Sequence, residues 1–221
     1  MFWLYTRDFG LLKVLARGIR KLNSKLRGSL GLFSLAEVSF VQGRRHKVLT
    51  GALTQESFSQ AKGGLVRLRL LFRLGWIFCF LVPSQEKDKN LWKLMEQAWL
   101  RLEKEELSFS ESILFYYRFF WQLVFLLGYG PELYHCVFCR KRIASQVFFV
   151  AQEGGLACSE CLKKKRLRAR KISETSLKLL RLLLNSPWED LKKEKLRPEL
   201  KNLYQEQLVF LRSERLGNRT S

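Results

Sequence analysis

Four of the five cysteines fall into two Cys-x2-Cys pairs, and this spacing is the strongest chemical signal in the chain. The pairs are Cys136 with Cys139 and Cys158 with Cys161. In each pair the chain turns so that two thiolates reach one ion, and a second pair completes a tetrahedron. Thiolate ligands favour zinc over harder cations, and four of them leave no open position for water. The sequence therefore predicts one structural Zn²⁺ per chain.

Other interpretations of the cysteines are weaker. Two disulfides would need an oxidising compartment, and nothing in the sequence indicates one. His135 precedes the first pair and could replace a ligand, although a surface histidine is the better interpretation. The fifth cysteine, Cys79, lies in an apolar segment and is expected to be a buried, unreactive core thiol.

The net charge indicates a polyanionic partner. The 221 residues include 40 Lys and Arg against 20 Asp and Glu, a formal net charge of +20. Residues 1–82 and 136–221 each carry +11, whereas residues 83–135 carry −2. Such a surplus concentrates polyanions near the protein, with nucleic acid the commonest partner and anionic membrane the second. The alternative is a basic protein whose charge only keeps it in solution. Basic clusters occur at residues 17–27, 44–47 and 163–171.

The elements that must position these residues are short strands first and helices afterwards. Residues 35–41 alternate, with Val38 and Phe40 on one face, and residues 48–54 alternate with Leu49 and Leu53 on one face. Strands separated by glycine turns favour a small barrel. Residues 64–82 favour a helix that leaves the barrel. Between the two cysteine pairs, a strand at 147–150 is followed by a tight turn.

The second half is predicted to be mostly helical. The predicted helices cover residues 91–104, 113–127, a block from Ser173 to before Pro187, and residues 200–211. Ser108 or Ser110 can cap the second of these helices, because Glu111 follows. That helix is apolar nearly all round but carries Arg118, so the centre of a bundle is favoured over a membrane span.

Motifs for catalysis are missing from the sequence. There is no phosphate-binding glycine loop, no HExxH, no set of convergent carboxylates for two metals and no cysteine or serine with an obvious histidine partner. We therefore expect no enzymatic activity. The N-terminus also lacks a signal-peptide pattern, which favours a cytoplasmic protein.

Several motifs resemble those of a known family. Residues 4–10 (LYTRDFG), residues 15–21 (LARGIRK) with Ser24 and Lys25 after them, and Leu30 with Phe33 resemble the N-terminal barrel of the bacterial recombination and repair family RecO. Residues 127–131 (LGYGP) before the first cysteine pair, and Gly154-Gly155 before the second, resemble its zinc-bearing helical domain. The resemblance covers nearly the whole chain.

This resemblance implies an α+β fold: an N-terminal OB-fold β-barrel followed by an all-helical domain with an inserted four-cysteine zinc module. The expected limits are 1–60 for the barrel, 61–221 for the helical domain and 132–165 for the module. The family usually has a further strand before the LYTRDFG-like stretch. Three explanations stay open here: an incomplete barrel, a misassigned start site, or replacement of that strand by another element.

The resemblance also implies a non-catalytic mediator of DNA repair and recombination. Such a protein binds single- and double-stranded DNA, anneals complementary strands, and associates with RecR and the single-strand-binding protein to help load the RecA recombinase. We expect it in the bacterial cytoplasm at the nucleoid, with no membrane partner. A zinc-dependent RNA-binding or ribosome-associated module is the alternative, and a membrane-surface protein is the third interpretation.

Candidate nucleic-acid-binding residues come from the first two basic clusters, because barrels that bind single strands track phosphates through basic loops. The resemblance and the charge pattern agree on Arg17, Arg20, Lys21, Lys25 and Arg27, while charge and loop position alone indicate Arg44, Arg45 and Lys47. Bases could stack on Phe2, Trp3, Tyr5 or Phe9, for which core packing is an equal expectation.

Overall fold

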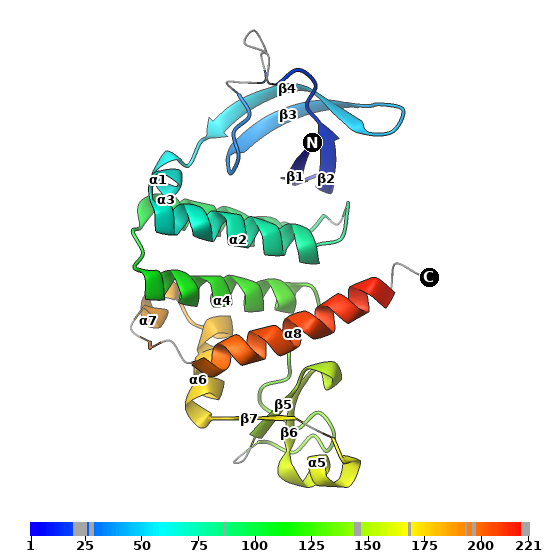
Figure 1. Ribbon diagram of the computed structural model, residues 1–221, viewed down its shortest axis with the longest axis vertical. Helices are drawn as coiled ribbons and strands as arrows, with labels where there is room; N and C mark the ends of the chain where they lie inside the picture. Colours follow the sequence, from blue (N-terminus) through cyan, green and yellow to red (C-terminus); the bar gives the residue numbers. More distant parts are fainter. Residues whose placement is uncertain are drawn as a thin grey trace. The chain divides into compact units, whose positions relative to one another are not determined.

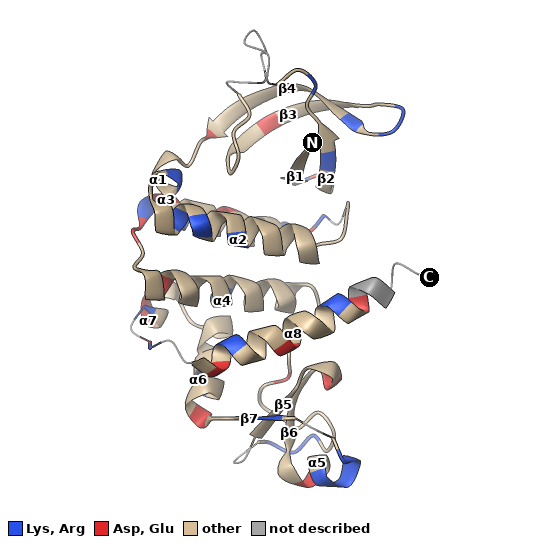
Figure 2. Ribbon diagram, in the orientation of Figure 1, with Lys and Arg blue, Asp and Glu red and all other residues tan. Residues whose placement is uncertain are grey.

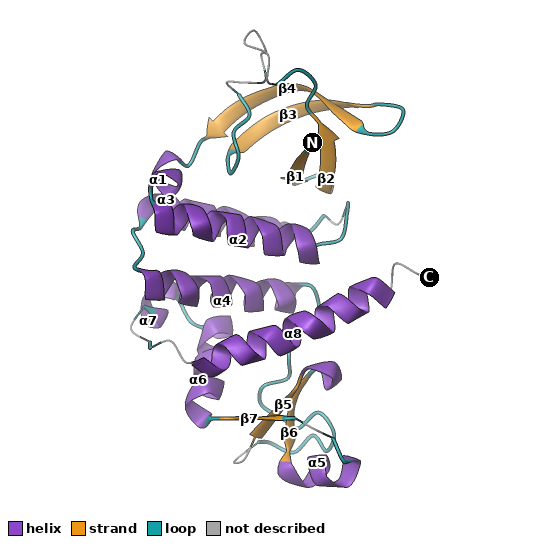
Figure 3. Cartoon of the chain, in the orientation of Figure 1, coloured by secondary structure: helices purple, strands orange, loops and turns teal. Residues whose placement is uncertain are grey.

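The chain combines a four-stranded sheet with helices and a smaller second sheet, which is the predicted α+β class (Figure 1; Figure 3). The computed structural model describes residues 1–19, 26, 29–85, 87–143, 147–167, 169–192, 194–195 and 198–217. It forms two compact units, Met1–Ser112 and Ile113–Ser221. The expected limits 1–60, 61–221 and 132–165 concern independently folding domains and stay a prediction.

The sheet of the first unit has the strand order β1-β2-β4-β3. Its strands are β1 (Phe2–Thr6), β2 (Gly10–Leu15), β3 (Leu35–Gln42) and β4 (Lys47–Glu56). The neighbours β1 and β2, and β3 and β4, are antiparallel, whereas β2 and β4 run parallel where Val14 pairs with Lys47. The strands predicted at 35–41 and 48–54 are confirmed.

The predicted orientation of Leu53 is wrong, because β4 carries a bulge. Ser39 pairs with Gly51 and the next residue, Phe40, pairs with Leu49, so Thr50 is an extra residue on β4. A bulge reverses the alternation of side chains beyond it. Leu49 is therefore 3% exposed, while Leu53 points outward and is 66% exposed.

The first sheet packs on both faces. On one face Leu49 lies with Ala16, Leu26 and Leu30 in a buried cluster. On the other face the ring of Tyr5 packs edge-on against a helix, with its centroid 4.7 Å from that of Phe78. The helices of this unit are α1 (Ser59–Gly63), α2 (Leu65–Leu81) and α3 (Lys89–Lys104), which begins after the capping side chain of Asp88.

Helices α4 (Phe109–Leu126), α6 (Glu174–Asn185), α7 (Trp188–Leu191) and α8 (Pro198–Gly217) follow. Ser108 caps α4 in a reciprocal pair with Glu111, one of the two predicted caps. In the second unit α4 buries a row of aromatic side chains, and the hydroxyls of Tyr116 and Tyr204 lie 2.8 Å apart. Among the described helices, none has the length and apolar character required to span a bilayer.

The second sheet lies between α4 and α6 in the sequence. It consists of β5 (Val147–Val150), β6 (Gly155–Cys158) and β7 (Arg170–Ile172) in the order β6-β5-β7, with helix α5 (Ser159–Lys165) between β6 and β7. The short turn η1 (Ala151–Glu153) joins β5 to β6. We call residues 132–172 the cysteine module. Phe149 of β5 packs edge-on against Trp121 of α4, which attaches the module to the helices of its unit.

Candidate metal centre and basic surfaces

The two cysteine pairs come together in the cysteine module. All four sulfur atoms lie within 4.8 Å of one another, and those of Cys139 and Cys158 are 3.9 Å apart. A tetrahedral ion with zinc–sulfur bonds of about 2.3 Å separates its sulfurs by about 3.8 Å. A disulfide needs about 2.05 Å. All five cysteines are free thiols, so the donor set fits one tetrahedral cation and not two disulfides.

The first pair lies on a tight turn. The N–H of Arg140 donates to the carbonyl of Cys136, and the N–H of Cys136 donates to the carbonyl of Lys141, both at 2.9 Å. Arg140 adopts a left-handed backbone with φ 60°. This turn brings Cys139 back beside Cys136.

The second pair lies where a strand becomes a helix. Cys158 is the last residue of β6, and Cys161 lies in the first turn of α5. The N–H of Cys158 donates to the sulfur of Cys136 over 3.5 Å, which joins the two pairs directly. A strand end and a helix start therefore supply two ligands, and the tight turn supplies the other two.

The sulfurs differ in their readiness to ionise. Burial raises the pKa of Cys136, but N–H donors of Cys139, Cys158 and Phe138 outweigh it and lower that pKa to about 6. The pKa of Cys161 rises to about 12, mainly because its thiol hydrogen-bonds to Cys158 and lies beside other sulfurs. Four crowded sulfurs cannot all become thiolates without a cation, and this donor chemistry is that of a zinc or other soft-metal site.

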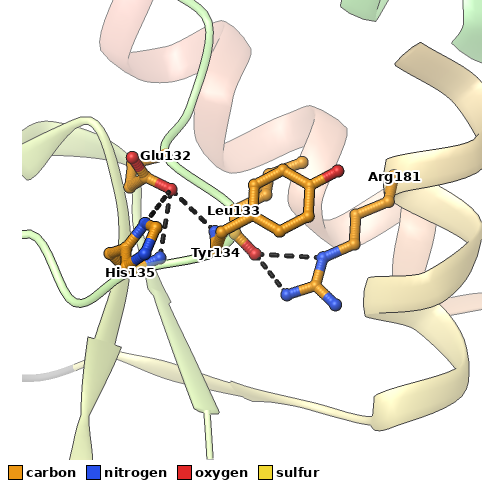
Figure 4. Close-up of polar contacts among 5 residues, drawn as sticks. All are labelled: Glu132, Leu133, Tyr134, His135 and Arg181. Atoms are coloured by element: carbon orange, nitrogen blue, oxygen red, sulfur yellow. Dashed lines mark hydrogen bonds and ion pairs between the residues drawn. The ribbon is translucent and has the colours of Figure 1, made fainter. Parts of the chain in front are cut away.

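Glu132 positions the chain just before the first pair (Figure 4). Its Oε1 accepts from the N–H groups of Tyr134 at 2.7 Å and His135 at 3.0 Å, and the first of these is the main reason that its pKa is lowered. The Nδ1 of His135 lies 3.6 Å from the same oxygen. His135 is exposed and outside the sulfur cluster, as the interpretation as a surface histidine predicted.

Arg181 of α6 attaches the module to the helices, as Figure 4 also shows. Its Nε donates to the carbonyl of Leu133 at 3.0 Å. Its guanidinium carbon lies 4.6 Å from the centre of the Tyr134 ring, a cation–π contact. The segment that leads into the first cysteine pair is therefore fixed from both sides, by Glu132 and by Arg181.

The predicted nucleic-acid-binding residues are only partly described. Arg20, Lys21, Lys25 and Arg27 lie outside the described residues. Arg17 is exposed in the turn after β2, and Arg44 and Arg45 are exposed in the turn between β3 and β4. Lys47 begins β4, and its Nζ lies 5.5 Å from the centre of the Phe40 ring. Neither Arg44 nor Arg45 forms an ion pair within the part of the chain that the structure describes.

Of the aromatic candidates, two are exposed and two are packed. Trp3 is 49% exposed and Phe9 is 52% exposed, whereas Phe2 and Tyr5 pack against the cores on either face of the sheet. The sequence patterns did not single out Lys13, whose Nζ lies 5.6 Å from the centre of the Trp3 ring. The strand alternation around Lys13 could have predicted its outward orientation.

Comparison with known proteins agrees with this architecture. The family model described as "Recombination protein O N terminal" matches residues 1–58, and "Recombination protein O C terminal" matches residues 79–220. The protein named DNA repair protein RecO of Dehalococcoides mccartyi is 28% identical over 181 residues, which cover 81% of this chain and 69% of that protein. Its namesake in Pelotomaculum thermopropionicum is 27% identical over 184 residues, covering 83% and 70%. The chain belongs to the RecO family of recombination and DNA repair proteins.

Proposed function

We propose that this chain is a non-catalytic recombination mediator. It binds single- and double-stranded DNA, anneals complementary strands and helps to load the RecA recombinase onto protein-coated single strands. The observation that carries the proposal is the match to both RecO family models, in order, along one chain. RecO proteins in general act as non-catalytic mediators, and we expect the same of this one in the bacterial cytoplasm.

In this proposal the first sheet is part of an OB-fold barrel, with limits near 1–60, that holds the nucleic acid. Its exposed cations neutralise phosphates, so two strands approach with less mutual repulsion. The proposed contacts are Arg17, Arg20, Lys21, Lys25, Arg27, Arg44, Arg45 and Lys47. Support comes from the exposure of Arg17, Arg44 and Arg45 and from the exposed Trp3, on which a base could stack.

The cysteine module would hold one Zn²⁺ through Cys136, Cys139, Cys158 and Cys161. When bound, the ion supplies a cross-link between the two cysteine pairs and no reaction chemistry, because four sulfurs fill its coordination sphere. The helical region after residue 60 would dock RecR and the single-strand-binding protein.

Strand annealing tests this proposal. The full chain should anneal complementary DNA strands, both bare and coated with single-strand-binding protein. With about six phosphates contacted on a single strand, log affinity should fall against log salt with a slope near −4. Matched RNA strands serve as the comparison: activity restricted to RNA, or a slope of zero with DNA, would contradict the proposal.

Substitution of the cations in the turn between β3 and β4 tests whether the first sheet contacts the nucleic acid. Arg44→Ala, Arg45→Ala and Lys47→Ala together should make the slope shallower by about 2 on single strands, because each phosphate that is no longer neutralised changes it by about 0.7. The matched control removes three exposed cations of the second unit, Lys178, Lys195 and Lys201, and should leave the slope unchanged. Equal slopes for the two triple variants would contradict the assignment to the sheet.

A further inference from the structure

The cysteine module carries far more positive charge than its own structure uses. Residues 132–172 contain ten Lys and Arg residues but only three acidic residues, Glu132, Glu153 and Glu160. Four thiolates around one divalent ion leave a charge of about −2, which two of these cations would balance. A surplus of positive charge remains, and it lies outside the sheet to which DNA binding was assigned above.

Three separate segments bring these cations around one small core. That core consists of Cys136, Val150, Ala157 and Leu162. The exposed cations that the structure describes around this core come from three segments. They are Arg140, Lys141 and Arg142 after the first cysteine pair; Lys163, Lys164, Lys165 and Arg166 at the end of helix α5; and Lys171 on strand β7. In Figure 2 the end of α5 is blue, the colour of Lys and Arg.

Two contacts join these segments into one surface. The Nζ of Lys165 lies 4.8 Å from the centre of the Phe138 ring, so the end of α5 lies against the turn of the first cysteine pair. On the sheet, Phe148 pairs with both Lys171 and Ala157. Paired residues of neighbouring strands point to the same face, so Lys171 lies on the face that carries the core of the module.

Within the described part of the chain, the cations of this surface lack acidic partners. Arg170, their neighbour on β7, donates to Glu206 over 2.5 Å, but none of the eight exposed cations named above forms an ion pair. Basic residues in the last turn of α5 do benefit from the helix dipole. That benefit is confined to the last turn of the helix, so it does not explain why Arg140, Lys141 and Lys171 carry positive charge without an ion pair in the described part of the chain.

The chemistry of the surface favours a phosphate backbone over a lipid bilayer. A helix that lies in a membrane interface needs an apolar face to insert. The apolar residue of α5, Leu162, is 7% exposed and belongs to the core of the module. Closely spaced cations without such an apolar face suit the regular phosphates of a nucleic acid, with which they exchange counterions.

We propose that the cations around the cysteine core form a second phosphate-binding surface, which binds a nucleic-acid backbone independently of the first sheet. One chain then holds two nucleic-acid segments, one on each unit. The inference stands on the charges of the module and does not require the first sheet to bind. It gives the cysteine module a direct role in binding, whereas the metal ion keeps only its structural role.

Charge removal at the end of α5 tests this surface in the full, metal-loaded chain. Lys163→Ala, Lys164→Ala and Arg166→Ala together should make the salt slope shallower by about 2 on oligothymidylate and by about 3 on a duplex. The control triple variant, Lys178→Ala with Lys195→Ala and Lys201→Ala, removes the same charge outside the module. Unchanged metal content in both variants shows that the module remains folded.

Comparison with the sheet variant separates this inference from the proposed function. If both the α5 triple and the Arg44, Arg45 and Lys47 triple weaken binding, and only their combination abolishes it, two surfaces are supported. If the α5 triple binds like its control while the sheet triple is impaired, this inference is overturned and the proposed function stands. If only the α5 triple is impaired, this inference stands and the sheet assignment fails.

A bridging assay provides an independent readout. Two oligothymidylates, one with a donor and one with an acceptor fluorophore, should be brought together by the unchanged chain and not by either triple variant. Flotation with anionic vesicles tests the lipid alternative. If the unchanged chain floats with the vesicles and the α5 triple variant does not, while both bind the oligonucleotide equally, the inference is overturned in favour of a lipid surface.

Discussion

The two small sheets of this protein are stabilised in different ways. The sheet of the first unit buries Leu49 in a cluster of aliphatic side chains and packs Tyr5 against helices on its other face. One face of the sheet in the cysteine module packs against a cluster that includes the thiol of Cys136, with Cys158 and Cys161 beside it, and on its other face Phe149 packs against Trp121 of α4. An ion held by the four sulfurs would cross-link the two cysteine pairs on the first of these faces. We therefore expect metal loading to stabilise the module, whereas apolar burial alone stabilises the sheet of the first unit.

Metal removal is the change with the largest expected effect. Chelation, or Cys139→Ser, should unfold the module and leave the first sheet intact, because structural zinc supplies an apparent free energy on the order of 10 kcal/mol. Elemental analysis should fall from about one zinc per chain to none. The matched control is Cys79→Ser on α2, which lies outside the sulfur cluster. A metal-free chain in which the module stays folded would contradict this prediction.

Truncation of Leu49 should destabilise the first unit without affecting metal content. Leu49→Ala should lower its free energy of unfolding by about 2–5 kcal/mol, the usual cost of a deleted core side chain. Leu53→Ala on the same strand should change it by less than about 0.5 kcal/mol, because the bulge turns Leu53 outward. Chemical denaturation measures both variants. Equal losses would mean that β4 has no bulge at Thr50.

A substitution at the first residue of β6 should affect the module alone. The added Cβ of Gly155→Ala would lie 2.5 Å from the backbone carbonyl oxygen of Glu132, which is too close without a shift of the backbone. We expect a loss of about 1–3 kcal/mol in module stability and weaker metal retention during a chelator titration.

Gly154→Ala provides the matched control for Gly155→Ala. A Cβ at Gly154 meets nothing within 4 Å, so only its φ of 74° opposes a side chain. Its cost should be about 1 kcal/mol. A larger loss for Gly154→Ala than for Gly155→Ala would contradict the close approach of β6 to Glu132.

The smallest expected effect is a pH dependence. N–H donation from Tyr134, the main cause, lowers the pKa of Glu132 below its ordinary value of 4.5 in the folded module. A lowered folded-state pKa stabilises the fold above the unfolded-state pKa, and this contribution disappears as pH falls through the folded-state pKa. Wild type should therefore exceed Glu132→Gln in melting temperature near neutral pH, with a gap that narrows on acidification. A constant gap would contradict this contribution.

Sequence patterns predicted the local elements well, because their signals are local. The alternation at 35–41 predicted β3, the capping pair of Ser108 and Glu111 predicted the start of α4, and the cysteine spacing predicted the sulfur cluster. The orientation of Leu53 was missed because a bulge depends on the register between two strands and leaves no mark in one of them. The cations Arg140 to Arg142 were missed for a similar reason: their meaning depends on what α5 and β7 place beside them.

By itself, the sequence determined the chemistry of the parts: two thiol pairs spaced for one ion, an apolar helix with capping residues, and a large positive charge. These follow from residue type and spacing within a few turns of chain. Only the tertiary structure decided which cations share a surface, because Lys165 meets Phe138 by packing and Lys171 meets Phe148 by strand pairing, each between segments that are distant in the sequence. Electrostatic attraction to a polyanion depends on distances in space, and those distances exist only once the chain has folded.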